Sequence, residues 1–175
     1  MSKFRITYRG TVYPWQCDHM GHMNVMWYTG KFDEASWQFL ASLGFNRARL
    51  RKENACMAAL EQHIIYKREL RAGDIVTIRS AVIEVKDKIS RVLHEMRNDE
   101  TGDVVATASI VAIYFDATAR EARSMPSDLK MRAEAALNCW ETGCTASEEG
   151  LEFGIDPPDD SGVNLQSDLF PAVRT

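Results

Sequence analysis

Four segments with the composition of β-strands follow one another along the chain, at residues 56–68, 75–86, 89–98 and 104–116. Only short turn-like sequences separate them, whereas a parallel pairing would need a crossover of roughly a dozen or more residues. Strands joined so closely pair as antiparallel neighbours. We therefore predict an antiparallel meander of four strands without crossover helices.

The last of these segments is unusually apolar. Between residues 104 and 115 the small polar side chains are only Thr107 and Ser109. A strand of this kind is buried on both faces or lies against a partner. A further strand is expected at residues 4–15, which are rich in Phe, Ile, Tyr, Val and Trp.

A long amphipathic helix is expected between the first strand and the meander. Asn24 is of a type that caps helices, and apolar side chains then recur at steps of three and four as far as Leu43. Gly44 follows, where a glycine commonly ends a helix. Gly30 inside the helix costs about 1 kcal/mol relative to alanine, which suggests that another group packs closely against it. The apolar positions are Val25, Tyr28, Phe32, Ala35, Phe39 and Leu43.

A second helix is predicted at about residues 126–137, with Met131, Ala135 and Leu137 on its apolar side. The order is therefore strand, helix, four strands and helix, with residues 45–54 left unassigned. One helix has to cover one face of a five-stranded antiparallel sheet, and the other face stays polar or meets a partner. The predicted fold class is α+β.

Charge is distributed unevenly along the 175 residues. The net charge of −4 combines −7 in residues 139–175 (eight acidic side chains and one basic) with +3 in residues 1–138, since −4 minus −7 is +3. A mildly basic body suits a small anionic ligand, but it lacks the basic stripe of nucleic-acid-binding proteins. We assign residues 1–138 to a single domain and residues 139–175 to an acidic C-terminal extension.

Other features of the sequence indicate where in the cell the protein is expected. No stretch approaches the roughly 20 apolar residues of a membrane helix, and the first residues lack the apolar core of a signal peptide. The four cysteines form no Cys-x-x-Cys pair, which argues against a zinc site or a disulfide framework. We therefore expect a cytoplasmic protein without membrane or nucleic-acid partners.

The clearest chemical signal lies between Asp18 and Tyr28. A carboxylate precedes the predicted helix start, where the first turn leaves backbone amides without partners. Those amides and the helix dipole stabilise a developing oxyanion, and such donors in a dry site contribute about 3 kcal/mol or more. Gly21 lets the backbone approach closely. A carbonyl held by the amides would lie within reach of Asp18, an arrangement suited to acyl transfer.

The pattern Asp-x-x-Gly-His-x-Asn, which begins at Asp18 and is followed by Tyr28, resembles the 4-hydroxybenzoyl-CoA thioesterase family of hotdog-fold proteins. The resemblance covers residues 5–130. It implies an antiparallel sheet wrapped around the helix that begins near Asn24, and a homodimer or tetramer with the acyl pocket at the subunit interface. It also implies hydrolysis of an acyl-CoA without metal or bound cofactor, coenzyme A being part of the substrate.

The resemblance also implies roles for individual residues. The catalytic carboxylate falls on Asp18, which attacks the thioester as a nucleophile or activates a water molecule as a general base. The amide that polarises the carbonyl falls on the backbone of Val25. His22 and Asn24 belong to the same catalytic motif, and hydrogen bonds that orient the loop are the commoner role of such a histidine. The expected substrate contacts are Gly21, Tyr28 and Trp27.

Two departures from the family pattern leave the substrate open. Gln16 stands where many members have a second acid, and Val25 stands where many have asparagine. Trp15, Trp27 and Trp37 pack in the core or at a dimer interface, or they line an acyl pocket whose aromatic faces favour a quaternary ammonium group.

Other interpretations stay open at this point. Asp18 is also of a type that satisfies amides in turns, and with His19 and His22 it suggests a metal site, although no third histidine is locally spaced. Lys67 and Arg68 have the character of a solvated hairpin end, or they meet the phosphates of coenzyme A. The alternative function is a non-hydrolytic acyl-CoA-binding hotdog domain.

Overall fold

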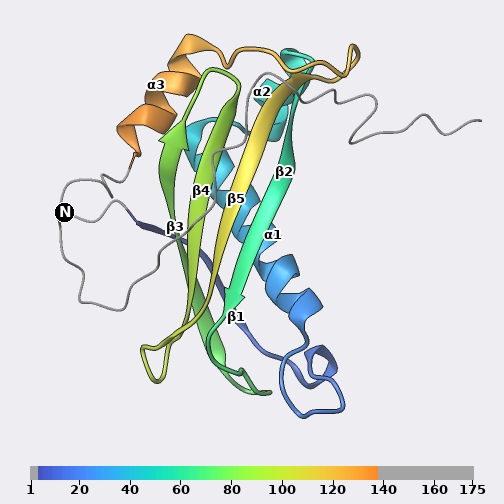
Figure 1. Ribbon diagram of the computed structural model, residues 1–175, viewed down its shortest axis with the longest axis vertical. Coiled ribbons are helices and arrows are strands. Elements are labelled where there is room, and N and C mark those ends of the chain that lie inside the picture. Colours follow the sequence, from blue (N-terminus) through green and yellow to red (C-terminus); the bar gives the residue numbers. More distant parts are fainter. Residues whose placement is uncertain (1–3, 138–175) are drawn as a thin grey trace, which may run out of the picture.

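The computed structural model describes residues 4–137, so the predicted acidic extension lies outside the described residues. This part of the chain forms a five-stranded antiparallel sheet with a long helix across one face (Figure 1), which confirms the α+β class. The strands are β1 (Arg5–Thr11), β2 (Ala55–Tyr66), β3 (Ile75–Val85), β4 (Ile89–Asn98) and β5 (Val104–Asp116). The helices are α1 (Val25–Leu43), α2 (Arg47–Lys52) and α3 (Ser127–Ala135), and a 3-10 turn, η1, spans Pro14–Gln16.

The strand order differs in one place from the predicted meander, which was wrong for β2. The sheet runs β1-β3-β4-β5-β2, so β2 pairs with β5 at the far edge instead of with β3. The connection from β2 to β3, residues 67–74, crosses the end of the sheet. It holds the fully buried Leu70, whose carbonyl accepts the Met23 N–H (2.7 Å). The burial and hydrogen bond of Leu70 hold the connection in its path across the sheet toward β3.

Local signals place α1 where the sequence predicts it. The Asn24 side chain accepts a hydrogen bond from the Met26 N–H (3.1 Å) and caps the first turn. Gly44 ends the helix with a φ of 104°, a left-handed conformation that glycine adopts without strain. The group expected to pack closely against Gly30 is not found within residues 4–137, where a Cβ at this position would meet nothing within 4 Å. The buried positions of α1 are Tyr28, Lys31, Phe32, Ala35, Phe39, Leu40 and Leu43.

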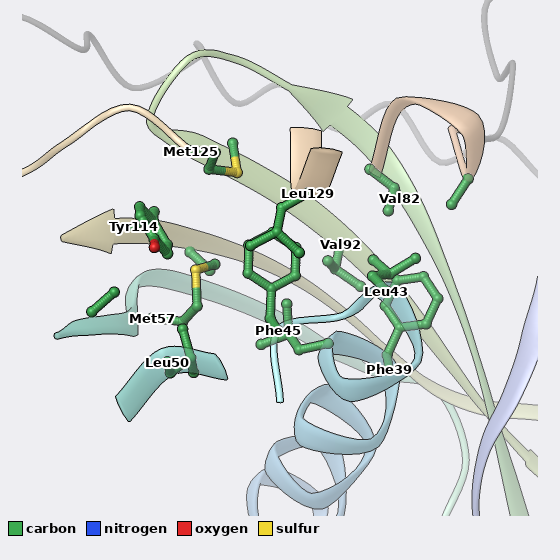
Figure 2. Close-up of a cluster of buried hydrophobic side chains, with 14 residues drawn as sticks. Phe39, Leu43, Phe45, Leu50, Met57, Val82, Val92, Tyr114, Met125 and Leu129 are labelled. Carbon is green, nitrogen blue, oxygen red and sulfur yellow. The ribbon is translucent and has the colours of Figure 1, made fainter. Parts of the chain in front are cut away.

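The core between α1 and the sheet divides into two clusters. The first half of α1 packs against the sheet through residues such as Phe32, which lies with Ile78. Its last turns are covered by α2 and α3, which bring Leu50 and Leu129 into the same cluster as Phe39 (Figure 2). Other elements therefore enclose one end of α1.

Two predictions near this enclosed end are corrected by the structure. Residues 45–54, left unassigned by the sequence, contain the short helix α2. In α3 the buried side chains are Leu129 and Ala133. Met131, expected on the apolar side, is exposed.

The apolar strand β5 is buried along almost its whole length, residues 105–115. Because successive side chains alternate between the two faces of a sheet, Tyr114 packs in the cluster beneath α1, whereas Val111 and Ile113 pack with Ile89 in a separate cluster. The expectation that this strand is buried on both faces is confirmed. None of the helices described is long and apolar enough to cross a membrane.

Candidate active site

A tight loop connects η1 to the start of α1. An antiparallel bridge joins Cys17 to Met23, and inside it the Asp18 N–H donates to the His22 carbonyl (3.1 Å). The Gly21 N–H donates back to the Asp18 carbonyl (3.0 Å). Gly21 has a φ of 81°, and nothing lies within 4 Å of a Cβ built there. Turn geometry, and not a close neighbour, therefore accounts for this glycine.

The two oxygens of the Asp18 carboxylate are held by different donors. Oδ1 accepts the Met20 N–H (2.9 Å), and Oδ2 accepts a hydrogen bond from Asn24 Nδ2 (3.0 Å). The Asn24 amide and then the Met20 N–H hold the pKa of Asp18 below its ordinary value, because both stabilise the charged form. The loop thus presents an oriented carboxylate that is ionised at neutral pH.

Asn24 couples this carboxylate to the helix. Its Nδ2 donates to Asp18 while its Oδ1 accepts from Met26, so one side chain sets the position of both groups. Between them, the N–H of Val25 has no hydrogen-bond acceptor among residues 4–137. Val25 is the first residue of α1 and is 55% exposed. The positive end of the helix dipole therefore presents a free donor.

Asp18 and Val25 line one open pocket with a volume of about 260 Å³. The pocket lies between the start of α1 and the segment in which β2 ends and its connection to β3 begins. Residues far apart in the sequence therefore meet at the free helix-start amide. The other lining residues are His22, Met23, Tyr28, Tyr66, Lys67, Arg68 and Glu69.

Tyr28 is a fixed, neutral part of this pocket. Its hydroxyl donates to the Arg68 carbonyl (3.3 Å), and burial raises the pKa of Tyr28 to about 12. Its ring meets that of Tyr66 edge to face, with centroids 5.2 Å apart. The start of α1 and the end of β2 are thereby locked together.

His22 links the two sides of the pocket in a second way. Its Nε2 lies 3.6 Å from Oε1 of Glu69, which comes from the β2–β3 connection. The two groups form an ion pair when the imidazole is protonated. The backbone carbonyl of His22 also accepts the amide of Asp18. The loop-orienting role expected for the histidine side chain stays a prediction.

The structure brings most of the expected site residues together. Asp18, His22, Val25 and Tyr28 line the pocket, and Asn24 contacts Asp18 directly. Two expected substrate contacts, Gly21 and Trp27, are not among the residues that line it. Trp27 packs, partly buried, against the core cluster beneath the first half of α1.

Three pocket residues were not predicted from the sequence, namely Met23 in the Asp18 loop and two residues from the end of β2 and its connection. Tyr66 and Glu69 reach the pocket because β2 lies at the sheet edge beside β5 and its connection turns toward the Asp18 loop. Lys67 and Arg68, interpreted mainly as a solvated hairpin end, line the same pocket. No local pattern marks this segment, so only the correct strand order would have indicated it.

The part of the chain that the structure describes contains no group of three or more His, Cys, Asp or Glu side chains placed to hold a metal ion. Asp18 is engaged instead by the amides of Met20 and Asn24. The arrangement suits an anion or an oxyanion at the helix start.

Comparison with known proteins identifies a family and a shared fold. Residues 12–133 match the family described as the thioesterase-like superfamily. A relative from Agrobacterium fabrum (strain C58), named L-carnitine dehydrogenase/betainyl-CoA thioesterase, is 30% identical over 126 residues, 72% of this chain. The chain spans 25% of the length of that relative.

Solved structures share the fold. A Staphylococcus aureus protein in complex with CoA aligns with a TM-score of 0.74 at 18% identity, over 89% of this chain and 97% of that chain. The 1,4-dihydroxy-2-naphthoyl-CoA thioesterase from Synechocystis aligns with a TM-score of 0.65 at 15% identity, over 73% and 94%. These likenesses confirm the predicted hotdog fold. Since the family match covers more than half of the chain, this protein belongs to the thioesterase-like superfamily.

Proposed function

We propose that the protein hydrolyses an acyl-CoA to a carboxylic acid and coenzyme A, with Asp18 and the Val25 backbone amide as its catalytic groups. The observation that carries this proposal is the meeting of an oriented carboxylate and a free helix-start N–H at one pocket. Acyl transfer needs both groups. The carboxylate supplies electrons to the carbonyl carbon, directly or through water, and the N–H stabilises the charge that develops on the carbonyl oxygen.

Two routes use these groups. In the first, an Asp18 oxygen bonds to the thioester carbon, the oxyanion is held by the Val25 N–H, and its collapse expels the thiolate of coenzyme A. Water then opens the mixed anhydride. In the second, Asp18 takes a proton from a water molecule whose oxygen attacks the same carbon. The oxyanion then collapses and expels the thiolate of coenzyme A, and Asp18 gives up its proton to that thiolate or to solvent. Neither route requires a metal or a bound cofactor, and in both Asn24 keeps the carboxylate ionised and oriented.

The proposal includes a homodimer or tetramer in which a neighbouring subunit covers the pocket. Large apolar side chains are exposed within a short stretch around the Asp18 loop, among them Trp15, Met20, Val25 and Met26. Exposed apolar groups that gather at one place mark an interaction surface. Analytical ultracentrifugation that finds an active monomer would contradict this part of the proposal.

The sharpest test removes the Val25 N–H while keeping the helix. Proline is well accepted at the first position of a helix. Asn24 before it has φ −67° and ψ 145°, the extended conformation that proline favours in its predecessor. We expect Val25→Pro to retain the thermal stability of the wild type while kcat falls by about 100-fold or more, the effect of losing one oxyanion donor.

Val25→Ala is the matched control, because it shortens the side chain and retains the N–H. Its loss of activity is expected to be far smaller than that of Val25→Pro. Both variants are assayed by release of free thiol from acyl-CoA. Equal losses would assign the effect to the side chain and contradict the proposed role of the amide.

Asp18→Asn tests the carboxylate with little change of shape. Thiol release is expected to fall by at least about 100-fold, while binding of acyl-CoA, measured by calorimetry, is retained. Binding without turnover of aliphatic, aromatic and cationic acyl-CoAs by the wild type would favour the alternative, a non-hydrolytic acyl-CoA-binding domain.

A further inference from the structure

Two tyrosine rings extend the pocket beyond the groups that activate the thioester. Tyr28 and Tyr66 meet at an interplanar angle of 82°. Tyr66 is 47% exposed and lines the pocket, so an aromatic surface is available to a bound acyl group.

A second carboxylate lies in the same pocket. Glu69 lines it together with Asp18. The Glu69 oxygens lie 3.6 Å from His22 Nε2 and 3.9 Å from Arg71 Nη2. Glu69 therefore has Arg71, and His22 when protonated, as ion-pair partners, but its side chain is 62% exposed and remains open to a bound cation. An aromatic face beside a carboxylate is the chemistry that binds organic cations.

The aromatic and acidic groups lie close to the reacting carbonyl. Tyr28 follows Val25 by three residues on α1, a rise of about 4.5 Å along the helix axis. The Tyr66 ring centroid lies 5.2 Å from that of Tyr28. A cation held there would be separated from the carbonyl at Val25 by a short spacer. The pocket volume of about 260 Å³ accommodates a small acyl group.

Arg68, one of the two basic residues that line the pocket, has an acidic partner outside it. Arg68 is directed to the β4–β5 turn, where its Nε lies 3.4 Å from Asp103 Oδ2. Lys67 also lines the pocket and offers a positive charge to the phosphates of coenzyme A. A substrate with a cationic acyl end and a polyanionic carrier matches both charges.

We propose that this pocket takes a small acyl group bearing a quaternary ammonium near the thioester carbonyl, bound by the Tyr66 ring and the Glu69 carboxylate. A quaternary ammonium has no N–H to donate, so ring faces and through-space attraction to a carboxylate bind it without hydrogen bonds. The inference rests on the proposed thioesterase activity and adds the substrate class, which the name of the Agrobacterium fabrum relative also carries.

The test compares two thioesters of the same shape. (Trimethylammonio)acetyl-CoA and 3,3-dimethylbutanoyl-CoA differ by a charged nitrogen in place of a neutral carbon. Each kcat/KM is divided by the rate constant for uncatalysed hydrolysis, because the ammonium also makes its thioester more reactive. We expect the wild type to prefer the cationic thioester by at least about tenfold after this correction.

Substitutions then locate the origin of the preference. Glu69→Gln removes the charge, and Tyr66→Leu removes the ring. Each is expected to reduce the preference by at least about threefold. Tyr66→Phe retains the ring and should retain most of the preference. Glu121→Gln, which removes an exposed carboxylate before α3, is the control for a general change of charge.

The outcomes separate this inference from the proposed function. A preference that falls in Glu69→Gln and Tyr66→Leu but persists in Tyr66→Phe and Glu121→Gln supports the inference. Turnover of the neutral thioester at an equal or higher corrected rate overturns it and leaves the thioesterase activity standing. A preference unchanged by both substitutions also overturns it. Hydrolysis of neither thioester, nor of any other acyl-CoA, overturns the proposed function and the inference together.

Discussion

The two ends of α1 lie in opposite surroundings. At its start Val25 and Met26 are exposed, and the first amide has no acceptor within residues 4–137. At its other end Phe39 and Leu43 are buried beneath α2 and α3 (Figure 2). We call these the open end and the closed end. The same helix therefore contributes to a pocket at one end and to the core at the other.

The backbone groups of the two ends differ in the same sense. At the closed end the Phe45 N–H donates to the Leu40 carbonyl and the Gly44 N–H to the Ala41 carbonyl (both 3.0 Å), a Schellman arrangement. At the open end the Asn24 side chain satisfies the Met26 amide and leaves the preceding one free. The Val25 N–H, which has no acceptor within residues 4–137, is therefore available to a substrate.

Acidic side chains show the same contrast. At the closed end Asp128 is paired with Arg49, which lowers the pKa of Asp128 to about 2. Arg49 also donates to Glu53 (2.8 Å), which accepts the Tyr114 hydroxyl (2.7 Å). Asp18 at the open end is held by amides instead. Its charge is therefore oriented but not neutralised by a cation.

The largest effect is expected from truncating the closed end. Phe39 is 1% exposed, and Phe39→Ala is expected to lower the free energy of unfolding by about 3–5 kcal/mol through lost contacts and a cavity. Met26→Ala, at a position that is 61% exposed, should change it by less than about 0.5 kcal/mol. Urea unfolding measures both. A comparable loss for Met26→Ala that is independent of protein concentration would break the contrast, since a concentration-dependent loss reports subunit contact.

The middle of α1 provides the next effect, which depends on pH. His94 on β4 is fully buried, with Nδ1 2.7 Å from Ser80 Oγ and Nε2 3.1 Å from Ser36 Oγ on α1. Burial lowers the pKa of His94 from 6.5 to about 3. The unfolded chain binds this proton below pH 6.5 and the folded chain does not, so stability is lost as pH falls from 6.5 toward 3. The free energy of unfolding is expected to be about 2 kcal/mol lower at pH 5 than at pH 7.

His94→Gln is the matched control, because glutamine keeps donor and acceptor groups for the two serines without a titratable ring. Urea unfolding at pH 5, 6 and 7 should show much less pH dependence in this variant. A dependence as steep as that of the wild type would assign the effect to other groups and contradict the prediction.

The sequence predicted α1 and both of its ends because local rules suffice there. Asn24 and Gly44 act on backbone groups a few residues away. The position of β2 depends on its pairing with β5, whose residues come much later in the chain. The paired residues are 61 positions apart at Ala55↔Asp116 (116 − 55) and 40 apart at Tyr66↔Ala106 (106 − 66). An alternating pattern is satisfied by either neighbour, so the strands were predictable and their order was not.

The site divides in the same way. Asp18, Asn24 and Val25 lie in one short segment, and their spacing alone brings them together. Tyr66 and Glu69 enter the pocket only through the edge position of β2 and the crossing of its connection. The half of the site that we propose activates the thioester could therefore be located from the sequence, whereas the half that we propose selects the acyl group could not.

Glycine substitutions compare the two ends on a smaller scale. Gly44 and Gly21 both have positive φ, 104° and 81°, so alanine at either position strains the backbone. A Cβ at Gly44 would also lie 3.0 Å from Leu129 Cδ2, whereas one at Gly21 would meet nothing within 4 Å. We expect the free energy of unfolding to fall by about 2 kcal/mol in Gly44→Ala and about 1 kcal/mol in Gly21→Ala. Thermal unfolding measures both, and the reverse order would contradict the contrast.

The smallest expected change is in the pH profile of the open end. Asn24→Asp keeps an oxygen that caps the helix as well as asparagine does, so stability should change by less than about 0.5 kcal/mol. The amide donor to Asp18 is replaced by a second carboxylate, which raises the pKa of Asp18. In the proposed mechanism the ionised carboxylate of Asp18 attacks the thioester or accepts a proton from water. Activity is therefore lost as pH falls through the pKa of Asp18.

The acid limb of kcat/KM against pH is therefore expected to move to higher pH in Asn24→Asp. Asn24→Ala removes the cap and the donor together, so the limb should move in the same direction while stability falls by about 1 kcal/mol. Comparing Asn24→Asp with Asn24→Ala separates the two functions of Asn24, because aspartate keeps the helix cap but not the amide donor to Asp18. An acid limb that stays in place in both variants would mean that the ionisation of Asp18 does not limit the reaction, and the open end would then owe its activity to the amide of Val25 alone.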